Sequence, residues 1–267
     1  MRSLAMDSVL DGICAQTATF VREAGFTDVL IGLSGGLDSS VVAALACKAL
    51  GHEHVHGILM PSPYTSADSV RDASELARGL GISAPAFPIT ETFATFADDY
   101  ETFLDEPLSG LAAENTQARL RMCILMALSN AKGWMVLNTG NRSEAAMGYS
   151  TLYGDTAGAF APIGGLYKTE VFALAAHLNE QACRAGAQPP IPHNVLVKPP
   201  SAELSFGQTD EASLGISYDE LDELLFQMID KGRSPESISP EAQRVWERYE
   251  KNAFKRALEP PFAKINP

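Results

Sequence analysis

A glycine-rich segment between two apolar runs limits the possible folds of this chain most strongly. Ser34 to Ser40 reads SGGLDSS. It follows the apolar run 29–31, and the Ala-rich, apolar run 41–50 comes after it and ends at Gly51. This order predicts a strand, a tight loop and a helix. Glycines let the backbone turn sharply, so that successive N–H groups point inward beside the positive amino end of the helix. Such a loop is a cradle for an anion such as phosphate.

The carboxylate of Asp38 inside this loop restricts the choice of ligand. The segment has neither the GxxxxGK(S/T) pattern of a Walker loop nor the GxGxxG pattern of a dinucleotide-binding loop. A carboxylate beside a phosphate is unfavourable unless a cation bridges the two groups, so we expect Mg²⁺ at Asp38. A glycine turn in which Asp and Ser only cap the helix is the simpler alternative for a loop of this kind.

Strands and helices continue to alternate along the chain. The pattern predicts further strands at 55–60, 86–89 and 134–138, and helices at 7–24, 66–79, 91–104, 112–131, 169–179, 218–231 and 239–253. Ser66 is the expected N-cap of its helix, and aromatic residues give 91–104 an apolar face. Residues 148–168 and 186–217 are rich in Gly or Pro and are expected to be irregular. Together these elements predict an α/β fold, with a parallel sheet and helices on both faces. We expect a single domain over residues 1–267.

Charge, hydropathy and cysteine content exclude several classes of protein. The chain has 33 acidic and 20 basic residues and a net charge of −13, so it should repel nucleic acid. No apolar run approaches the roughly 20 residues of a membrane span, and the first residues lack the features of a secretory signal. The cysteines have no CxxC spacing, and we interpret them as reduced core residues of a cytoplasmic protein. They are Cys14, Cys47, Cys123 and Cys183.

Four ordered segments resemble a known family. SGGLDSS resembles the pyrophosphate-binding loop of the N-type ATP pyrophosphatases, which have a Rossmann-like, adenine nucleotide alpha-hydrolase-like fold. Within that group, three further segments resemble the NAD synthetases: ENTQARLRM at 114–122, the stretch from TGNRSE to YKTEV at 139–171, and KPPSAEL with QTDEASLGISYDELD at 198–222. The resemblance covers about residues 7–262.

This resemblance implies a reaction and a set of site residues. The carboxylate of deamido-NAD would attack the α-phosphorus of ATP and release pyrophosphate, and ammonia would then displace AMP to give NAD. Lys168 would stabilise the charge on the leaving pyrophosphate, and Asp155 would orient ammonia or accept its proton. The implied ATP site comprises Gly32, Leu33, Ser34, Gly35, Gly36, Leu37, Asp38, Ser39, Thr139, Lys168 and Ser201. The implied metal ligands are Asp38 and Glu144, and the implied deamido-NAD site comprises Asn115, Arg119, Glu144 and Lys255.

The chain departs from the small ammonia-dependent form of the family. That form usually has Lys, Asp and His where this chain has Leu152, Ala159 and Phe254. Residues 148–163 instead resemble the synthetase domain of the large glutamine-dependent enzymes, but the chain has no room for their glutaminase domain. We therefore expect the nitrogen to be ammonia, taken from solution or from a separate glutaminase subunit. The resemblance also implies a homodimer.

The sequence is also compatible with two other functions. One is the same ATP chemistry on another acceptor, as in GMP synthetase. The other is a nucleotide-binding sensor that has lost catalysis. The presence of Asp38, Glu144 and Lys168 argues against the sensor, because binding alone would not require all three.

Overall fold

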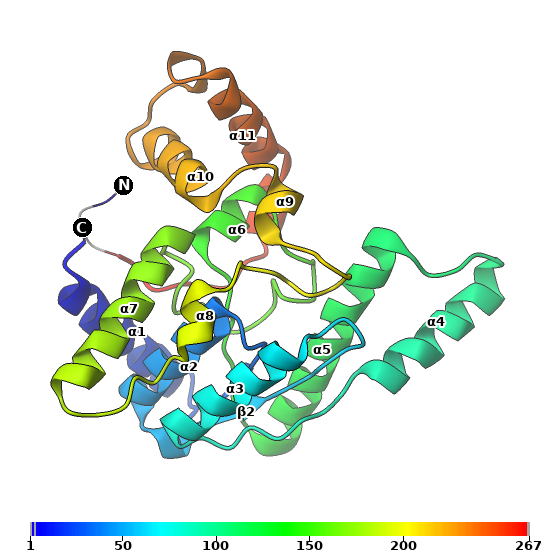
Figure 1. Ribbon diagram of the computed structural model, residues 1–267, viewed down its shortest axis with the longest axis horizontal. Helices are drawn as coiled ribbons and strands as arrows, with labels where there is room; N and C mark the ends of the chain where they lie inside the picture. The colour runs from blue at the N-terminus through cyan, green and yellow to red at the C-terminus, as the bar shows by residue number, and fades with distance from the viewer. Residues whose placement is uncertain (1, 3, 266–267) are drawn as a thin grey trace.

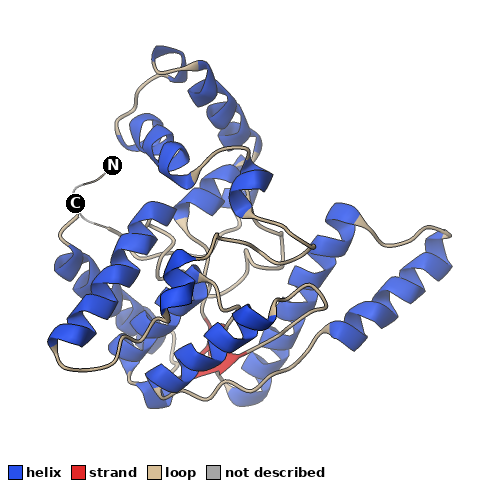
Figure 2. Cartoon of the chain, in the orientation of Figure 1, coloured by secondary structure: helices blue, strands red, loops and turns tan. Residues whose placement is uncertain are grey.

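The computed structural model describes residue 2 and residues 4–265, and a small parallel sheet lies at its centre (Figure 2). Strands β1 (Val29–Gly32), β2 (Val55–Ile58) and β3 (Met135–Val136) lie in the order β2-β1-β3. Val29 is paired with Val55 on one side and with Met135 on the other. The carboxyl ends of all three strands point to one edge of the sheet, which is where ligands bind in folds of this class.

The prediction of a strand at 86–89 was wrong. Ala86 forms only an isolated parallel bridge with Leu59, and Ser83 forms another with His56. Pro85 and Pro88 flank Ala86, and proline has no N–H to donate to a strand ladder. The segment therefore runs beside β2 without completing a fourth strand.

Helices cover both faces of the sheet, as predicted (Figure 1). Side chains alternate along β1: Val29 and Ile31 join the core with α1 (Met6–Glu23), α2 (Leu37–Leu50) and α7 (Lys168–Arg184). Leu30 points to the other face, where it joins Met122 and Leu125 of α5 (Gly110–Lys132). Burial on both sides explains why β1 begins as a continuous apolar run and does not alternate with polar residues.

The remaining helices include a C-terminal group that packs on its own apolar cluster. Leu221 of α10 and Val245 of α11 lie in this cluster with Met147 of α6, above the sheet in Figure 1. Ser66 caps α3 through the N–H of Ser69, as predicted. Two short helices interrupt the region 186–217 that was expected to be irregular. The bounds are α3 Ala67–Leu80, α4 Thr90–Leu104, α6 Arg142–Met147, α8 His193–Val197, α9 Asp210–Leu214, α10 Tyr218–Leu225, α11 Pro240–Lys251 and α12 Ala253–Arg256.

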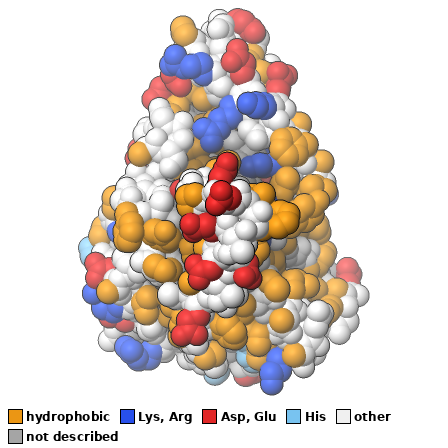
Figure 3. Space-filling view, turned by 90° about the vertical axis from the view of Figure 1, so that its right-hand side faces the viewer, with side chains coloured by type: hydrophobic (Ala, Val, Ile, Leu, Met, Phe, Trp, Pro, Cys, Tyr) orange, Lys and Arg blue, Asp and Glu red, His pale blue; other side chains and the backbone are white. Residues whose placement is uncertain are grey.

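The apolar face of α4, which was predicted from its aromatic residues, is largely exposed. Phe93 is buried, but Phe96 is 45% exposed and Phe103 is 85% exposed. Figure 1 shows α4 and the amino half of α5 projecting from the rest of the molecule, and Figure 3 shows hydrophobic side chains on the face that they present. The apolar spacing predicted the helix correctly, but it did not show what covers the face.

The cysteines and the helix lengths bear on two further predictions. All four cysteines are free, yet only Cys14 is buried, while Cys123 and Cys183 are exposed. The interpretation of the cysteines as core residues was therefore wrong for these two. Within residues 2 and 4–265, no helix combines the length and the apolar character that a membrane span requires.

Candidate functional site

The loop at the carboxyl end of β1 is shaped by one glycine and two serines. Gly35 has φ +78°, and a Cβ on it would lie 2.1 Å from the carbonyl oxygen of Ser69 in α3. The Ser34 N–H donates to Ser39 Oγ at 3.3 Å, and the Gly36 N–H donates to Ser34 Oγ at 3.1 Å. These bonds close the loop directly against the start of α2, which begins at Leu37.

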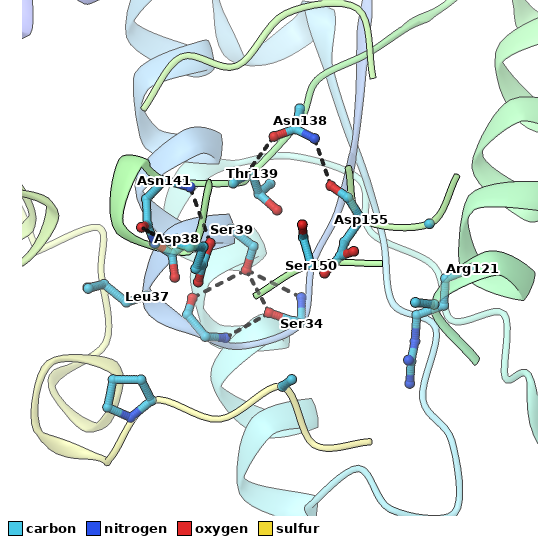
Figure 4. Close-up of a pocket in the computed structure, with 18 of the residues that line it drawn as sticks. Ser34, Leu37, Asp38, Ser39, Arg121, Asn138, Thr139, Asn141, Ser150 and Asp155 are labelled. Atoms are coloured by element: carbon cyan, nitrogen blue, oxygen red, sulfur yellow. Dashed lines mark hydrogen bonds between the residues drawn. The ribbon is translucent and has the colours of Figure 1, made fainter. Parts of the chain in front are cut away.

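The first turn of α2 presents unused N–H groups to a cavity. The N–H groups of Leu37, Asp38 and Ser39 have no acceptor within the described part of the chain. The loop lines a cavity of about 310 Å³ that spreads over the carboxyl edge of the sheet (Figure 4). Free N–H groups and the helix dipole both favour an anion there, which agrees with the phosphate cradle expected from the sequence.

Lys168 joins two carboxylates at the edge of the loop. Its Nζ lies 2.5 Å from Asp38 Oδ2 and 3.5 Å from Glu144 Oε1, and the lysine side chain is only 2% exposed. Lys168 is the first residue of α7, and its N–H donates to Ser143 Oγ at 2.9 Å. Burial alone would lower the pKa of Lys168, but the charges of Asp38 and Glu144 outweigh this effect and raise it. The ammonium group is therefore charged at neutral pH.

A capping box orients Glu144. Asn141 caps α6 by accepting from the Glu144 N–H at 3.0 Å, and Glu144 Oε2 accepts from the Asn141 N–H at 3.2 Å. The amide of Asn141 also donates to Asp38 Oδ1 at 3.0 Å. Burial and the neighbouring Asp38 raise the pKa of Glu144 to about 8, although Lys168 opposes the shift. Asn141 thus connects the two carboxylates that the resemblance assigns to the metal.

Asp38 and Glu144 are suited to Mg²⁺, which needs few protein ligands, and not to a metal that takes all of its ligands from the protein. Nowhere in the described ranges do three or more His, Cys, Asp or Glu side chains gather as metal ligands. Mg²⁺ typically binds one or two protein carboxylates together with substrate phosphates and water. Two carboxylates beside free N–H groups for phosphate match that arrangement.

Asp155 lies in the same cavity, on a turn that β3 positions. The amide of Asn138, just after β3, donates to the Asp155 carbonyl at 2.7 Å and to the Ala157 carbonyl at 2.9 Å. Asp155 Oδ1 accepts from the Thr151 N–H at 2.5 Å. Burial raises the pKa of Asp155, mainly because the carboxylate loses hydration. Sequence reasoning missed Asn138, although its position at the end of a strand indicated a site residue.

Three residues expected at the dinucleotide lie outside the cavity and hold the loop 148–155. Asn115 Oδ1 accepts from Thr151 Oγ1 at 2.7 Å, and Arg119 Nε donates to the Leu152 carbonyl at 3.1 Å. Lys255 Nζ donates to the carbonyls of residues 148 and 150 at 2.7 and 2.6 Å. Their assignment to deamido-NAD remains a prediction, and in this structure their side chains support the loop that carries Asp155.

The structure brings most of the expected ATP residues to the cavity. Thr139 and Ser201 line it with the loop residues, whereas Gly35 is packed behind them against α3. Among the described residues that line the cavity, six are acidic and three are basic. The acids are Asp38, Glu144, Asp155, Glu203, Asp210 and Glu259, and the bases are Arg121, Lys168 and Lys198.

Asp210 and Arg121 were not identified from the sequence. Asp210 is buried, its Oδ2 accepts from the Tyr218 hydroxyl at 3.1 Å, and its Oδ1 has no partner among the described residues. Burial raises the pKa of Asp210. The spacing of Arg121 from Arg119 within ENTQARLRM was a signal for the arginine, but nothing in the sequence marked Asp210 as buried.

Both the sequence and the fold are similar to those of known proteins. The sequence model described as NAD synthase matches residues 9–259. A glutamine-dependent NAD(+) synthetase from Thermotoga maritima is 46% identical over 89% of this chain, which spans only 41% of that protein. An NH(3)-dependent NAD(+) synthetase from Chlorobaculum tepidum is 40% identical over 92% of this chain and 85% of its own length.

A solved structure supports the same relationship. The NMN synthetase from Francisella tularensis superposes with a TM-score of 0.80 and 29% identity, covering 95% of this chain and 97% of that one. The match to the family extends over the loop of β1, the capping box and Lys168, which are the segments that build the cavity. The chain belongs to the NAD synthase family.

Proposed function

We propose that this chain catalyses the ATP-dependent amidation of deamido-NAD by ammonia, releasing AMP and pyrophosphate and forming NAD. The observation that carries the proposal is the group formed by Lys168, Asp38 and Glu144 at the edge of a loop with free N–H groups. Such a group is suited to a nucleotide whose phosphates are cleaved, because charge must be stabilised where pyrophosphate leaves.

The first step would be adenylation of the acceptor. The substrate carboxylate attacks the α-phosphorus of ATP, and the bond to the bridging oxygen of pyrophosphate breaks. The N–H groups of residues 37–39 and the ammonium of Lys168 would bind phosphate oxygens and stabilise the leaving group. Asp38 and Glu144 would hold Mg²⁺, which supplies charge neutralisation on the phosphates when bound.

The second step would be attack of ammonia on the adenylate. Ammonia loses a proton as the amide forms, and AMP leaves as a better leaving group than the carboxylate oxygen. Asp155 is the candidate for orienting ammonia or accepting this proton. Its turn faces the cavity, and burial raises the pKa of its carboxyl group toward the range in which such a base can work.

Ammonia is the proposed nitrogen source. The support is the NH(3)-dependent Chlorobaculum relative, which is 40% identical and which the chain matches over 85% of its length. We expect turnover with ammonium salts and none with glutamine in ammonia-free buffer. The nucleophile is NH₃, so the apparent KM for total ammonium should fall as pH rises from neutral. NAD made from glutamine by the purified chain would refute this part, and a poor ammonium KM that a glutaminase partner rescues would indicate a separate subunit.

The acceptor is tested by a direct comparison. Purified chain with ATP, Mg²⁺ and ammonium would receive deamido-NAD, nicotinate mononucleotide or XMP, and AMP release would be measured. Nicotinate mononucleotide is included because the Francisella neighbour is an NMN synthetase. Turnover with deamido-NAD alone supports the proposal. Preference for either other acceptor would contradict it, and ATP binding without turnover on any of the three would favour the sensor.

We further propose that the chain is a single domain and that it assembles as a homodimer. The exposed apolar side chains of α4 and α5, including Phe103 and Leu111, form a surface that a second copy would cover. Residues from the β1 loop and from the C-terminal α9 line the same cavity, which supports one functional unit over the whole chain. Four free cysteines suit a cytoplasmic enzyme. Sedimentation velocity of the purified chain measures its assembly directly.

A further inference from the structure

Arg121 is a partly buried cation that forms no ion pair with the described residues, although the charges of Glu203 and Asp155 act on it. It lines the cavity from α5, and its Nε donates to the Met60 carbonyl at 3.0 Å. That bond is its one hydrogen bond within the described ranges, and it forms no ion pair there. Burial lowers the pKa of Arg121 to about 10, because the charged guanidinium has lost hydration.

The other two basic residues of the cavity differ in this respect. Lys168 is paired with Asp38 and Glu144. Lys198 Nζ lies 3.0 Å from Asp72 Oδ2. A partly buried charge that forms no ion pair is better stabilised when a ligand with acceptor oxygens contacts it, so this guanidinium favours an incoming anion.

Apolar side chains line the cavity together with Arg121: Met60, Met122 and Leu125 belong to one apolar cluster. A Cβ on Gly32 would lie 3.1 Å from Met60 Cε and 3.6 Å from Leu125 Cδ1, so these groups are close together at the carboxyl ends of β1 and β2. In Figure 4, Arg121 and Asp38 lie on opposite sides of the group of lining residues. A planar guanidinium over apolar side chains suits a purine nucleotide, because it can stack on a base and donate to phosphate or ribose oxygens.

We infer that Arg121 binds the AMP half of ATP. The inference rests on the proposed function, which places the β- and γ-phosphates at residues 36–39 and at Lys168. From there the nucleoside would extend toward the side of the cavity that holds Arg121, the one described lining cation without an ion pair. The AMP half stays on the acceptor when pyrophosphate leaves, so Arg121 acts in both steps of the reaction.

The experiment measures binding of three ligands by calorimetry. ATP, AMP and inorganic pyrophosphate, each with Mg²⁺, are titrated into wild type, Arg121→Gln and Arg121→Lys. Arg184→Gln is the control, because Arg184 is 68% exposed and its one ion pair among the described residues is with Glu180 on its own helix. We expect Arg121→Gln to weaken ATP and AMP binding about tenfold or more and to leave pyrophosphate unchanged, since hydrogen bonds to charged groups are the strong ones. Arg121→Lys should recover part of the loss.

Three outcomes would overturn the inference. If Arg121→Gln binds ATP and AMP as tightly as wild type does, Arg121 is not part of the nucleotide site. If Arg121→Gln weakens pyrophosphate binding as much as ATP binding and also lowers the melting temperature, Arg121 has only a structural role. Wild type that binds no ATP refutes the proposed function and this inference with it, whereas normal ATP binding by wild type leaves the first two outcomes as a test of Arg121 alone.

Discussion

Replacing Gly35 with alanine tests whether the phosphate loop depends on direct contact with α3. Gly35 has φ +78°, where a Cβ is strained, and the added Cβ would lie 2.1 Å from the carbonyl oxygen of Ser69. Real Cβ atoms do not approach backbone oxygen that closely, so either the loop or the start of α3 must move by more than an ångström. Because Ser69 lies in the first turn of α3, its backbone cannot give way as a flexible side chain would.

Gly25 provides a control with the same strain and no clash. It has φ +82°, and a Cβ on it would have nothing within 4 Å. Alanine in the left-handed region costs about 1–2 kcal/mol, so Gly25→Ala should lower stability by roughly that amount. Gly35→Ala should add about 1–3 kcal/mol for the overpacked contact. The difference between the two variants isolates the contact between the loop and α3.

Urea unfolding and ATP titration measure the two consequences. The free energies of unfolding come from midpoints at a common slope. We also expect Gly35→Ala to lose most of its ATP affinity, because displacement of the loop moves the N–H groups of residues 37–39. Gly25→Ala should bind ATP as wild type does. If Gly35→Ala loses no more stability than Gly25→Ala and keeps its ATP affinity, the proposed dependence of the loop on α3 is refuted.

Three further predictions concern the carboxylates and Lys168. Asp38→Asn should slow turnover greatly and weaken its dependence on Mg²⁺, and near-normal kcat with unchanged Mg²⁺ dependence would remove Asp38 from the metal site. Lys168→Ala should lower kcat more than it raises the KM for ATP, because its contact strengthens as pyrophosphate leaves; a pure KM effect would contradict this. Burial and Asp38 raise the pKa of Glu144 to about 8, so a proton competes with Mg²⁺ below that pH. Mg²⁺ affinity measured by calorimetry should therefore rise as pH increases through about 8, and Glu144→Gln should flatten the profile.

Local sequence patterns predicted the elements whose causes are local. The apolar run at 29–31, the glycines at 35 and 36 and the Ala-rich run after them specify a strand, a turn and a helix within about twenty residues. Ser66 could be predicted as an N-cap for the same reason, because its acceptor role involves a residue only three positions away. The fold class followed from the alternation of such elements.

Features that depend on distant partners could not be predicted in the same way. The bond from Asn141 to Asp38 joins residues 103 positions apart, and the contact of Lys168 with Asp38 spans 130. The resemblance to a family, and not the local pattern, assigned Lys168 to the site. The exposed face of α4 has the spacing of a buried helix, because periodicity records which face is apolar and does not record what covers it.

The charge balance of the cavity explains why Mg²⁺ and ATP should bind together. A chain with a net charge of −13 and a cavity richer in acids than in bases is poorly suited to a free polyanion. Lys168 compensates the charge of Asp38 and also contacts Glu144, so its ammonium is held by these carboxyl groups. A divalent cation on the two carboxylates would replace that compensation and release the ammonium to the nucleotide. Each ligand therefore improves the site for the other, and linkage requires the gain in affinity to be equal in both directions.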